Sequence, residues 1–172
     1  MFILASASPR RRDLLLQIGA DFAAVTSGAE ESLEEAVPHE AVVRNALAKA
    51  RAVAAEYPEH AVLGADTAVV VDGRAFGKPH DLDDARRIIG LLAGRRHEVY
   101  TGVAWVYRGR AYTDVMKTIV QFASMPPAEI ERYVRSGEPM GKAGAYGIQG
   151  RGGVLVSSIT GDFYNVMGLP LQ

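Results

Sequence analysis

The sequence predicts one α/β domain over residues 1–172, with a central mixed, partly antiparallel sheet flanked by helices. Three observations favour this fold. Short apolar segments typical of strands alternate with helical repeats in the first half of the chain. Two long strand-like segments joined by a tight Arg-Gly-Arg turn predict antiparallel pairing in the second half. The chain contains no internal repeat and no low-complexity linker, and 172 residues fit a single domain.

The first half begins with a strand, a helix and a second strand. Phe2–Ala5 predicts a short buried strand, and Phe22–Val25 predicts another. Between them, Pro9 suits the first turn of a helix that Gly19 ends. Apolar residues at helical spacing from about Pro38 to Glu56 predict a long helix after the second strand.

The middle of the chain predicts a strand, a hairpin turn and a helix. Residues 61–72 are rich in strand-forming side chains, and Asp72-Gly73 is typical of a hairpin turn. Asp81 or Asp83 can begin the helix that follows, and Gly94 can end it.

The last part of the chain predicts three more strands and one helix. Long strands are expected over about 98–107 and 111–123, and a short helix over 126–136. Residues 141–153 contain six glycines, and a strand is expected over 154–159.

Composition excludes several classes of protein and site. With 19 basic and 20 acidic residues, the net charge of −1 provides no general attraction to nucleic acid or to an anionic membrane. The absence of cysteine excludes disulfides and thiolate zinc sites. The first residues place a short apolar stretch before the arginines, the reverse of a secretory signal, so a cytoplasmic protein is expected. The histidines lack metal-ligand or triad spacing and are expected at the surface: His39, His60, His80 and His97.

Residues 6–12, Ser-Ala-Ser-Pro-Arg-Arg-Arg, are the first candidate site. A strand that leads through a small polar turn into a helix presents backbone N–H groups and the positive end of the helix dipole. Two hydroxyls and three guanidiniums add donors suited to phosphate oxygens. A capped helix with a solvated run of arginines explains the same residues, so both interpretations stay open at this point.

Asp66 lies inside an apolar strand and is the second candidate. A carboxylate buried there without a partner would cost several kcal/mol. It could bind a metal, accept a proton from water or pair with a lysine, or it could sit at a bulge and bond backbone amides. Glu30 and Glu31 are possible acidic partners, while Lys49 and Lys78 could neutralise substrate charge. Taken singly, Glu30, Glu31 and Lys49 are most often plain surface charges. Magnesium prefers one or two carboxylates together with phosphate oxygens.

The glycine-rich segment 141–150 is the third candidate. Glycines at this density allow the backbone to approach a ligand closely, and Gln149 offers both a donor and an acceptor for the edge of a base. The segment matches neither the phosphate-binding P-loop nor a dinucleotide fingerprint. A structural glycine hinge is the alternative.

Five motifs occur in order along the chain: SASPRR at 6–11, GADT at 64–67, GKP at 77–79, KAGAYGIQG at 142–150 and GDFYNVMGLP at 161–170. Together they resemble the Maf family of nucleotide pyrophosphatases over essentially the whole chain. The resemblance implies a Maf/inosine-triphosphatase-like fold with a nucleotide cleft. It also implies a hydrolase that uses a divalent metal cation, Mg²⁺ or Mn²⁺, to convert a nucleoside triphosphate to the monophosphate and pyrophosphate.

The resemblance also assigns roles to individual residues. Asp66 is implied to be the catalytic carboxylate, and Glu31 and Asp66 are implied to be the metal ligands. The residues implied to handle phosphate are Ser8, Arg11, Lys49 and Lys78. The positions that differ between substrate branches are Arg10, Thr67 and Gln149. This set resembles the branch acting on dTTP and UTP, whereas the branch acting on 7-methylated GTP typically has Trp in place of Arg10 and Gln in place of Thr67.

The implied cellular roles are cleaning of nucleotide pools and a part in cell-division arrest. The alternatives are the same chemistry on a modified nucleotide, or a nucleotide-binding regulator of septum formation. Expected partners are a nucleoside triphosphate and a second copy of the chain in a homodimer, with neither nucleic acid nor membrane. Family members usually continue past the GLPL motif into a C-terminal helix, which would affect oligomeric contacts and stability rather than the candidate site.

Overall fold

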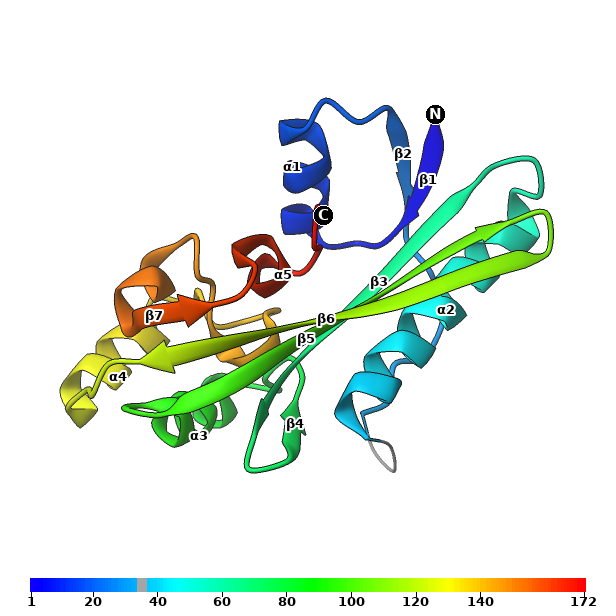
Figure 1. Ribbon diagram of the computed structural model, residues 1–172. Helices are drawn as coiled ribbons and strands as arrows, with labels where there is room; N and C mark the ends of the chain where they lie inside the picture. Colours follow the sequence, from blue (N-terminus) through cyan, green and yellow to red (C-terminus); the bar gives the residue numbers. More distant parts are fainter. Residues whose placement is uncertain (34–36) are drawn as a thin grey trace.

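A twisted seven-stranded sheet forms the centre of the computed structural model, which describes residues 1–33 and 37–172. Its strand order is β2-β1-β3-β5-β6-β7, and β4 pairs with β3 outside this path (Figure 1). The strands are β1 (Phe2–Ala5), β2 (Phe22–Val25), β3 (Val62–Val71), β4 (Arg74–Phe76), β5 (Arg96–Tyr107), β6 (Arg110–Phe122) and β7 (Val156–Thr160). Strand β1 runs parallel to β2 and β3, and the remaining pairs are antiparallel, so the predicted mixed sheet is confirmed.

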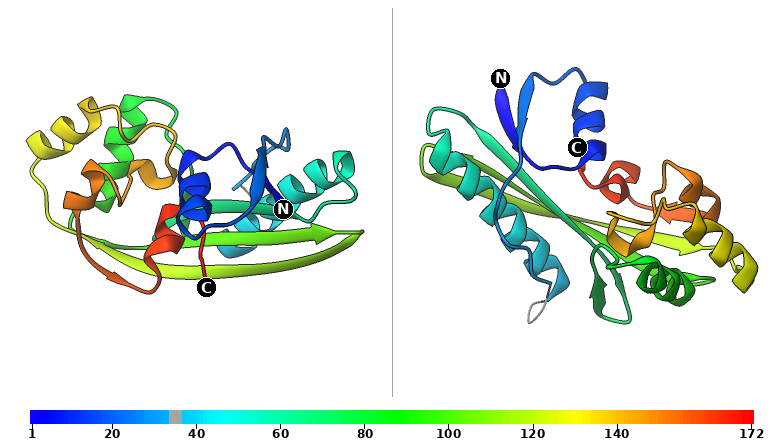
Figure 2. Two further views of the ribbon diagram at one scale, coloured as in Figure 1. Left: turned by 90° about the horizontal axis from the view of Figure 1, so that it is seen from above. Right: turned by 180° about the vertical axis from the view of Figure 1, so that it is seen from behind.

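Helices cover the sheet on both faces. They are α1 (Pro9–Gln17), α2 (Pro38–Glu56), α3 (Leu82–Leu92), α4 (Pro127–Arg135) and α5 (Phe163–Met167), with short 3₁₀ turns η1 (Ala143–Ala145) and η2 (Arg151–Leu155). Helix α2 lies along one half of the long strands, and α3 and α4 lie at the other half (Figures 1 and 2). None of the described helices has both the length and the apolar composition needed to cross a membrane.

Alternation along β3 divides the core into two clusters, because successive side chains of a strand point to opposite faces. Val62 packs with Ala46, Ala50 and Val53 of α2. Leu63 instead belongs to the larger cluster, which includes residues of α1, α3 and α4.

Two glycines allow α2 to lie directly against the sheet. A Cβ added to Gly64 of β3 would come within 2.2 Å of the Ala46 carbonyl oxygen. A Cβ at Gly102 of β5 would come within 2.5 Å of the Val42 carbonyl carbon. Larger residues would force the helix outward, so these glycines determine how close the side chains of α2 come to β3.

The structure corrects two expectations and adds one element. The expected strand over 154–159 begins only at Val156, because Val154 and Leu155 belong to η2, where Val154 is 82% exposed. His97 is buried at 2% exposure, not a surface residue, because the alternation of β5 points it into the core against Phe122 and Tyr146. The short helix α5 was not anticipated.

Candidate active site

An interrupted edge of strand β3 forms the floor of the main cleft. The pairing of β1 with β3 ends at Gly64, and the pairing of β4 begins at Val69. Among the described residues, no strand pairs with 65–68 on that side, so side chains from both faces of β3 reach one cavity. This cleft has a volume of about 470 Å³ and lies where β1 ends, the kind of position at which α/β sheets bind ligands. Its walls include 5–11, 141–143, 146–149 and 166–168.

Asp66 is held on the floor of this cleft by two residues of α2. Its Oδ1 lies 2.7 Å from Lys49 Nζ, and its Oδ2 accepts a hydrogen bond of 2.9 Å from Asn45 Nδ2. Asn45 and Lys49 are one helical turn apart and therefore lie on the same face of α2. Of the alternatives that the sequence left open, the structure shows pairing with a lysine. The β3–β5 register passes through Asp66 and Gly102 without a bulge.

Glu31 converges on the same ammonium group from the segment before α2. Its Oε1 lies 2.9 Å from Lys49 Nζ and 3.6 Å from Lys78 Nζ. Desolvation raises the pKa of Glu31, but the hydrogen bond and charge of Lys49, together with Lys78 and Arg11, outweigh it, so the pKa is lowered. Glu31 is therefore ionised at neutral pH. Glu30, the other acid considered, is exposed and is not among the described residues that line the cleft.

The two carboxylates are suitable ligands for a divalent cation whose coordination is completed by phosphate oxygens and water. Asp66 and Glu31 both reach one cation, the Lys49 ammonium, and so point at a common place. In the part of the chain that the structure describes, no group of three or more His, Asp and Glu side chains could hold a metal. Magnesium commonly binds one or two carboxylates together with phosphate oxygens and water, and this donor set suits that mode.

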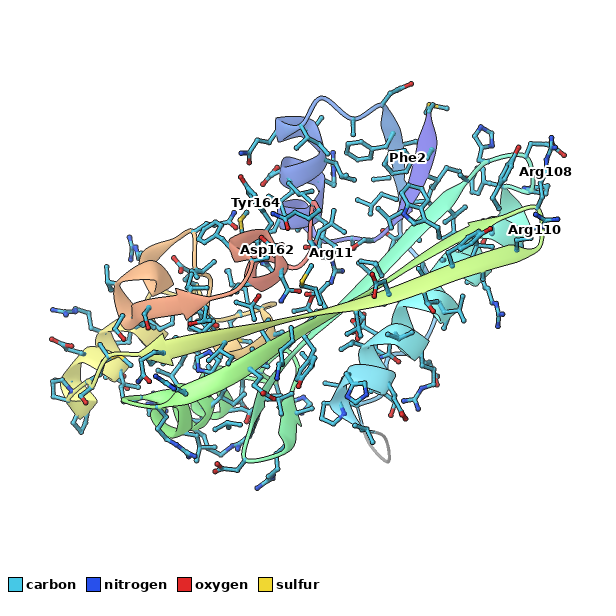
Figure 3. The ribbon with its side chains drawn as sticks, viewed as in Figure 1. Phe2, Arg11, Arg108, Arg110, Asp162 and Tyr164 are labelled. Carbon is cyan, nitrogen blue, oxygen red and sulfur yellow. The ribbon has the colours of Figure 1, made fainter. Side chains whose placement is uncertain are left out.

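Arg11 of α1 lines the same cleft, and Figure 3 shows it beside α5. Its Nε donates to the Gly168 carbonyl at 2.7 Å, its Nη1 to Ser6 Oγ at 3.1 Å and its Nη2 to Thr67 Oγ1 at 3.1 Å. Burial lowers the pKa of this guanidinium, while Asp66 opposes that effect. Each Nη carries a second N–H, so the group can both hold the wall together and donate into the cleft.

The remaining candidates line the cleft from separate segments. Arg10, half-buried at the start of α1, reaches the Gly141 carbonyl at 3.5 Å, and burial lowers its pKa. Gln149 is exposed on the glycine-rich segment opposite, and Thr67 lies deeper beside Arg11. Ser8 precedes α1, and its side chain makes no capping bond to the helix. The structure thus brings every residue to which the resemblance assigns a role to one cleft, whereas Arg12 and Glu30 do not line it.

Two residues that support the site were missed from the sequence. Asn45 is a buried amide on the apolar face of α2, and its spacing of four from Lys49 was the signal available. Glu138 follows α4, and its carboxylate accepts backbone N–H bonds of 2.8 Å from Arg151 and from Gly152. No pattern in the sequence linked Glu138 to the glycine-rich segment.

Comparison with known proteins gives consistent matches. The family model described as Maf-like protein matches residues 1–172. A dTTP/UTP pyrophosphatase of Symbiobacterium thermophilum is 52% identical over 171 residues, covering 99% of this chain and 88% of that protein. A dTTP/UTP pyrophosphatase of Moorella thermoacetica is 52% identical over 172 residues, covering 98% and 89%. Another from Bacillus cereus is 46% identical over 170 residues, covering 98% and 89%.

Among solved structures, the Ham1 protein of Staphylococcus aureus is a distant match, covering 70% of each chain at 14% identity and a TM-score of 0.49. The family match instead spans the whole chain, and relatives at about half identity cover nearly all of it. The chain therefore belongs to the family of Maf-like proteins.

Proposed function

We propose that this protein hydrolyses nucleoside triphosphates, with preference for dTTP and UTP, to the monophosphate and pyrophosphate. The observation that carries the proposal is the convergence of Asp66 and Glu31 on Lys49 at the floor of the cleft. The names of the relatives, which are dTTP/UTP pyrophosphatases, support the choice of substrate.

The wall formed by 5–11 supports binding of the triphosphate. Helix α1 begins at Pro9, and the N–H groups of Arg10 and Arg11 in its first turn lack intrahelical acceptors. These groups and the positive end of the helix dipole favour an anion at this point. We assign phosphate binding to the donors around it, which are Ser8, Arg11, Lys49 and Lys78.

A divalent cation, Mg²⁺ or Mn²⁺, would be held by Asp66 and Glu31 and by triphosphate oxygens. When bound, it would neutralise the negative charge that develops on the leaving pyrophosphate. In the proposed step the oxygen of a water molecule bonds to the α-phosphorus, and the bond from that phosphorus to the α–β bridging oxygen breaks. Asp66 accepts the proton of the water, and the bridging oxygen leaves with the pyrophosphate.

Selection of the base is assigned to Arg10, Thr67 and Gln149. The side chain of Gln149 offers a carbonyl oxygen as acceptor and an NH₂ group as donor to the polar edge of a pyrimidine. A mismatched base would leave these groups unpaired. Arg10 reaches the carbonyl of Gly141, which belongs to the same glycine-rich segment as Gln149. The bond from Arg11 holds the Thr67 hydroxyl in place.

A panel of nucleoside triphosphates, assayed with Mg²⁺, with Mn²⁺ and with EDTA, tests the proposal. We expect UTP and dTTP to be converted fastest, with monophosphate and pyrophosphate as products and no turnover in EDTA. Release of orthophosphate would overturn the proposed bond cleavage. Faster turnover of a modified nucleotide would overturn the substrate assignment.

The cellular roles are part of the same proposal. We place the protein in the cytoplasm, where it would clear nucleotide pools and act in cell-division arrest. Asp66→Asn separates the enzyme from a nucleotide-binding regulator of septum formation. A cell-division phenotype that survives this substitution would favour the regulator. The expected homodimer remains a prediction that sedimentation velocity can check.

A further inference from the structure

Asn45 contacts both acidic parts of the site, although it is not among the described residues that line the cleft. Its side chain is part of the face of α2 that packs on the sheet, and the residue is only 3% exposed. A buried amide must satisfy its donors and its acceptor within the protein. The hydrogen-bond partners of Asn45 therefore show which groups its side chain holds in place.

The first partner is the carboxylate on β3. Asn45 Nδ2 donates to Asp66 Oδ2 at 2.9 Å, while Lys49 holds Oδ1. The two oxygens of Asp66 thus have separate partners from one face of α2, which fixes the plane of the carboxylate.

The second partner is the backbone of the segment that carries Glu31. Asn45 Nδ2 also donates to the Ser32 carbonyl at 3.1 Å, and the Ser32 N–H donates to Asn45 Oδ1 at 3.3 Å. The amide side chain pairs with the backbone of Ser32 as a neighbouring strand would. Both donors and the acceptor of Asn45 are used, and all of them serve residues at or next to the two acids.

We propose that Asn45 is a positioning residue that aligns the two carboxylates of the site. It acts on Asp66 through its side chain and on Glu31 through the backbone of Ser32. The inference rests on the proposed function, because it deepens the role of the same two acids. Some residues orient a catalytic or metal-binding group without touching the substrate or the metal themselves. Substitution of such a residue typically lowers activity about 10- to 100-fold.

Arg44 provides a matched control on the same helix. Its Nη2 donates to the same Ser32 carbonyl at 3.0 Å, but the bond is exposed, and no contact with Asp66 is described for it. Arg44→Ala removes one bond to the segment and leaves the link to β3 intact. Asn45→Ala removes both links.

Steady-state kinetics with UTP and Mg²⁺ test the proposal. For Asn45→Ala we expect kcat to fall about 10- to 100-fold, with the KM for UTP within about threefold of wild type. Arg44→Ala should keep kcat within about twofold. A wild-type kcat for Asn45→Ala would overturn the proposal, and so would an equal loss in both variants, because docking of the segment alone would then explain the effect.

Hydrogen–deuterium exchange gives a second readout that does not depend on activity. In Asn45→Ala, peptides covering 27–33 should exchange faster than in wild type, while peptides covering β3 stay protected. If Asn45→Ala exchanges at 27–33 as slowly as wild type, the positioning role of Asn45 is overturned, whether or not the wild-type protein hydrolyses nucleotides. A wild type that hydrolyses none, with faster exchange in the variant, would instead contradict only the proposed function.

Asn45→Asp covers the case in which the alanine variant does not fold. It keeps the shape of the side chain and an acceptor for the Ser32 N–H, but it loses the donors and places a carboxylate beside Asp66. We expect its kcat to fall at least tenfold as well. A folded Asn45→Asp variant with wild-type kcat would overturn the proposal.

Discussion

Lys49 Nζ lies 2.7 Å from Asp66 Oδ1, in an ion pair whose two side chains are 9% and 8% exposed. Burial of a carboxylate in the apolar strand β3 would be costly without this partner. The same ammonium contacts Glu31 at 2.9 Å, so one residue of α2 offsets charge on both acids, and Lys78 adds a second cation near Glu31. The pair therefore connects the stability of the fold to the chemistry of the site.

Lys49→Met should lower the free energy of unfolding by about 3 kcal/mol in EDTA, because it leaves Asp66 buried without its cation. Urea unfolding measures this change. The double variant Lys49→Met/Asp66→Asn should recover part of the loss, since the uncompensated charge is gone. A single variant within about 0.5 kcal/mol of wild type would show that the pair contributes little to stability.

Gly64→Ala should destabilise the protein by about 2 kcal/mol or more, because the added methyl group would collide with the Ala46 carbonyl of α2. Gly90→Ala is the matched control: Gly90 lies inside α3 with open space around it, and alanine favours helix there by about 0.5–1 kcal/mol. Thermal unfolding of both variants checks the prediction. A Gly64→Ala protein as stable as wild type would mean that α2 can move outward at little cost.

Glu138→Ala should raise the KM for UTP about tenfold, because hydrogen bonds to a charged group stabilise by about 1.5–3 kcal/mol and the glycine-rich segment would lose two of them. Gln149 lies in that segment and lines the cleft. Glu129→Ala, at an exposed glutamate of α4, should leave KM unchanged. Equal KM values in the two variants would contradict a role for Glu138 in holding the segment.

His97 should make the protein less stable in acid. Burial lowers its pKa from 6.5 to about 4 in the folded state, so the unfolded chain takes up the proton first as the pH falls. Its contribution is complete above about pH 6.5 and is lost progressively toward pH 4, by about 3 kcal/mol in all. Urea unfolding between pH 4 and 7 should show a flatter profile for His97→Gln than for wild type. His39→Gln, at an exposed position, should keep the wild-type slope.

Most of the fold could be predicted from local patterns. The apolar run of Phe2–Ala5 and the helical spacing within Pro38–Glu56 each correspond to an observed element with the expected bounds. Errors arose where local pattern and tertiary contact disagree. The apolar side chains of Val154 and Leu155 suggest a strand, but their backbone turns in η2 before β7 begins.

The sequence indicated which residues belong to the candidate site better than it indicated how those residues contact one another. The seven residues 6–12 already offered donors for an anion, and Asp66 required a partner wherever it was buried. Pattern alone did not reveal that Arg11 would be buried and bonded to Gly168, 157 positions along the chain. Nor did it reveal that the turn with Arg108 and Arg110 lies far from Arg11, at the end of the β5–β6 hairpin (Figure 3).

The fold class, the family resemblance and the residue types available for chemistry follow from the sequence alone, because periodicity, turn residues and motifs are local properties of the chain. The partners of those residues depend on how the elements pack in three dimensions. Asp66 could have met a lysine, a metal or backbone amides, and the close packing of α2 on Gly64 brings Lys49 and Asn45 to it. Such pairings depend on the distance between a helix and a sheet, which no local pattern specifies.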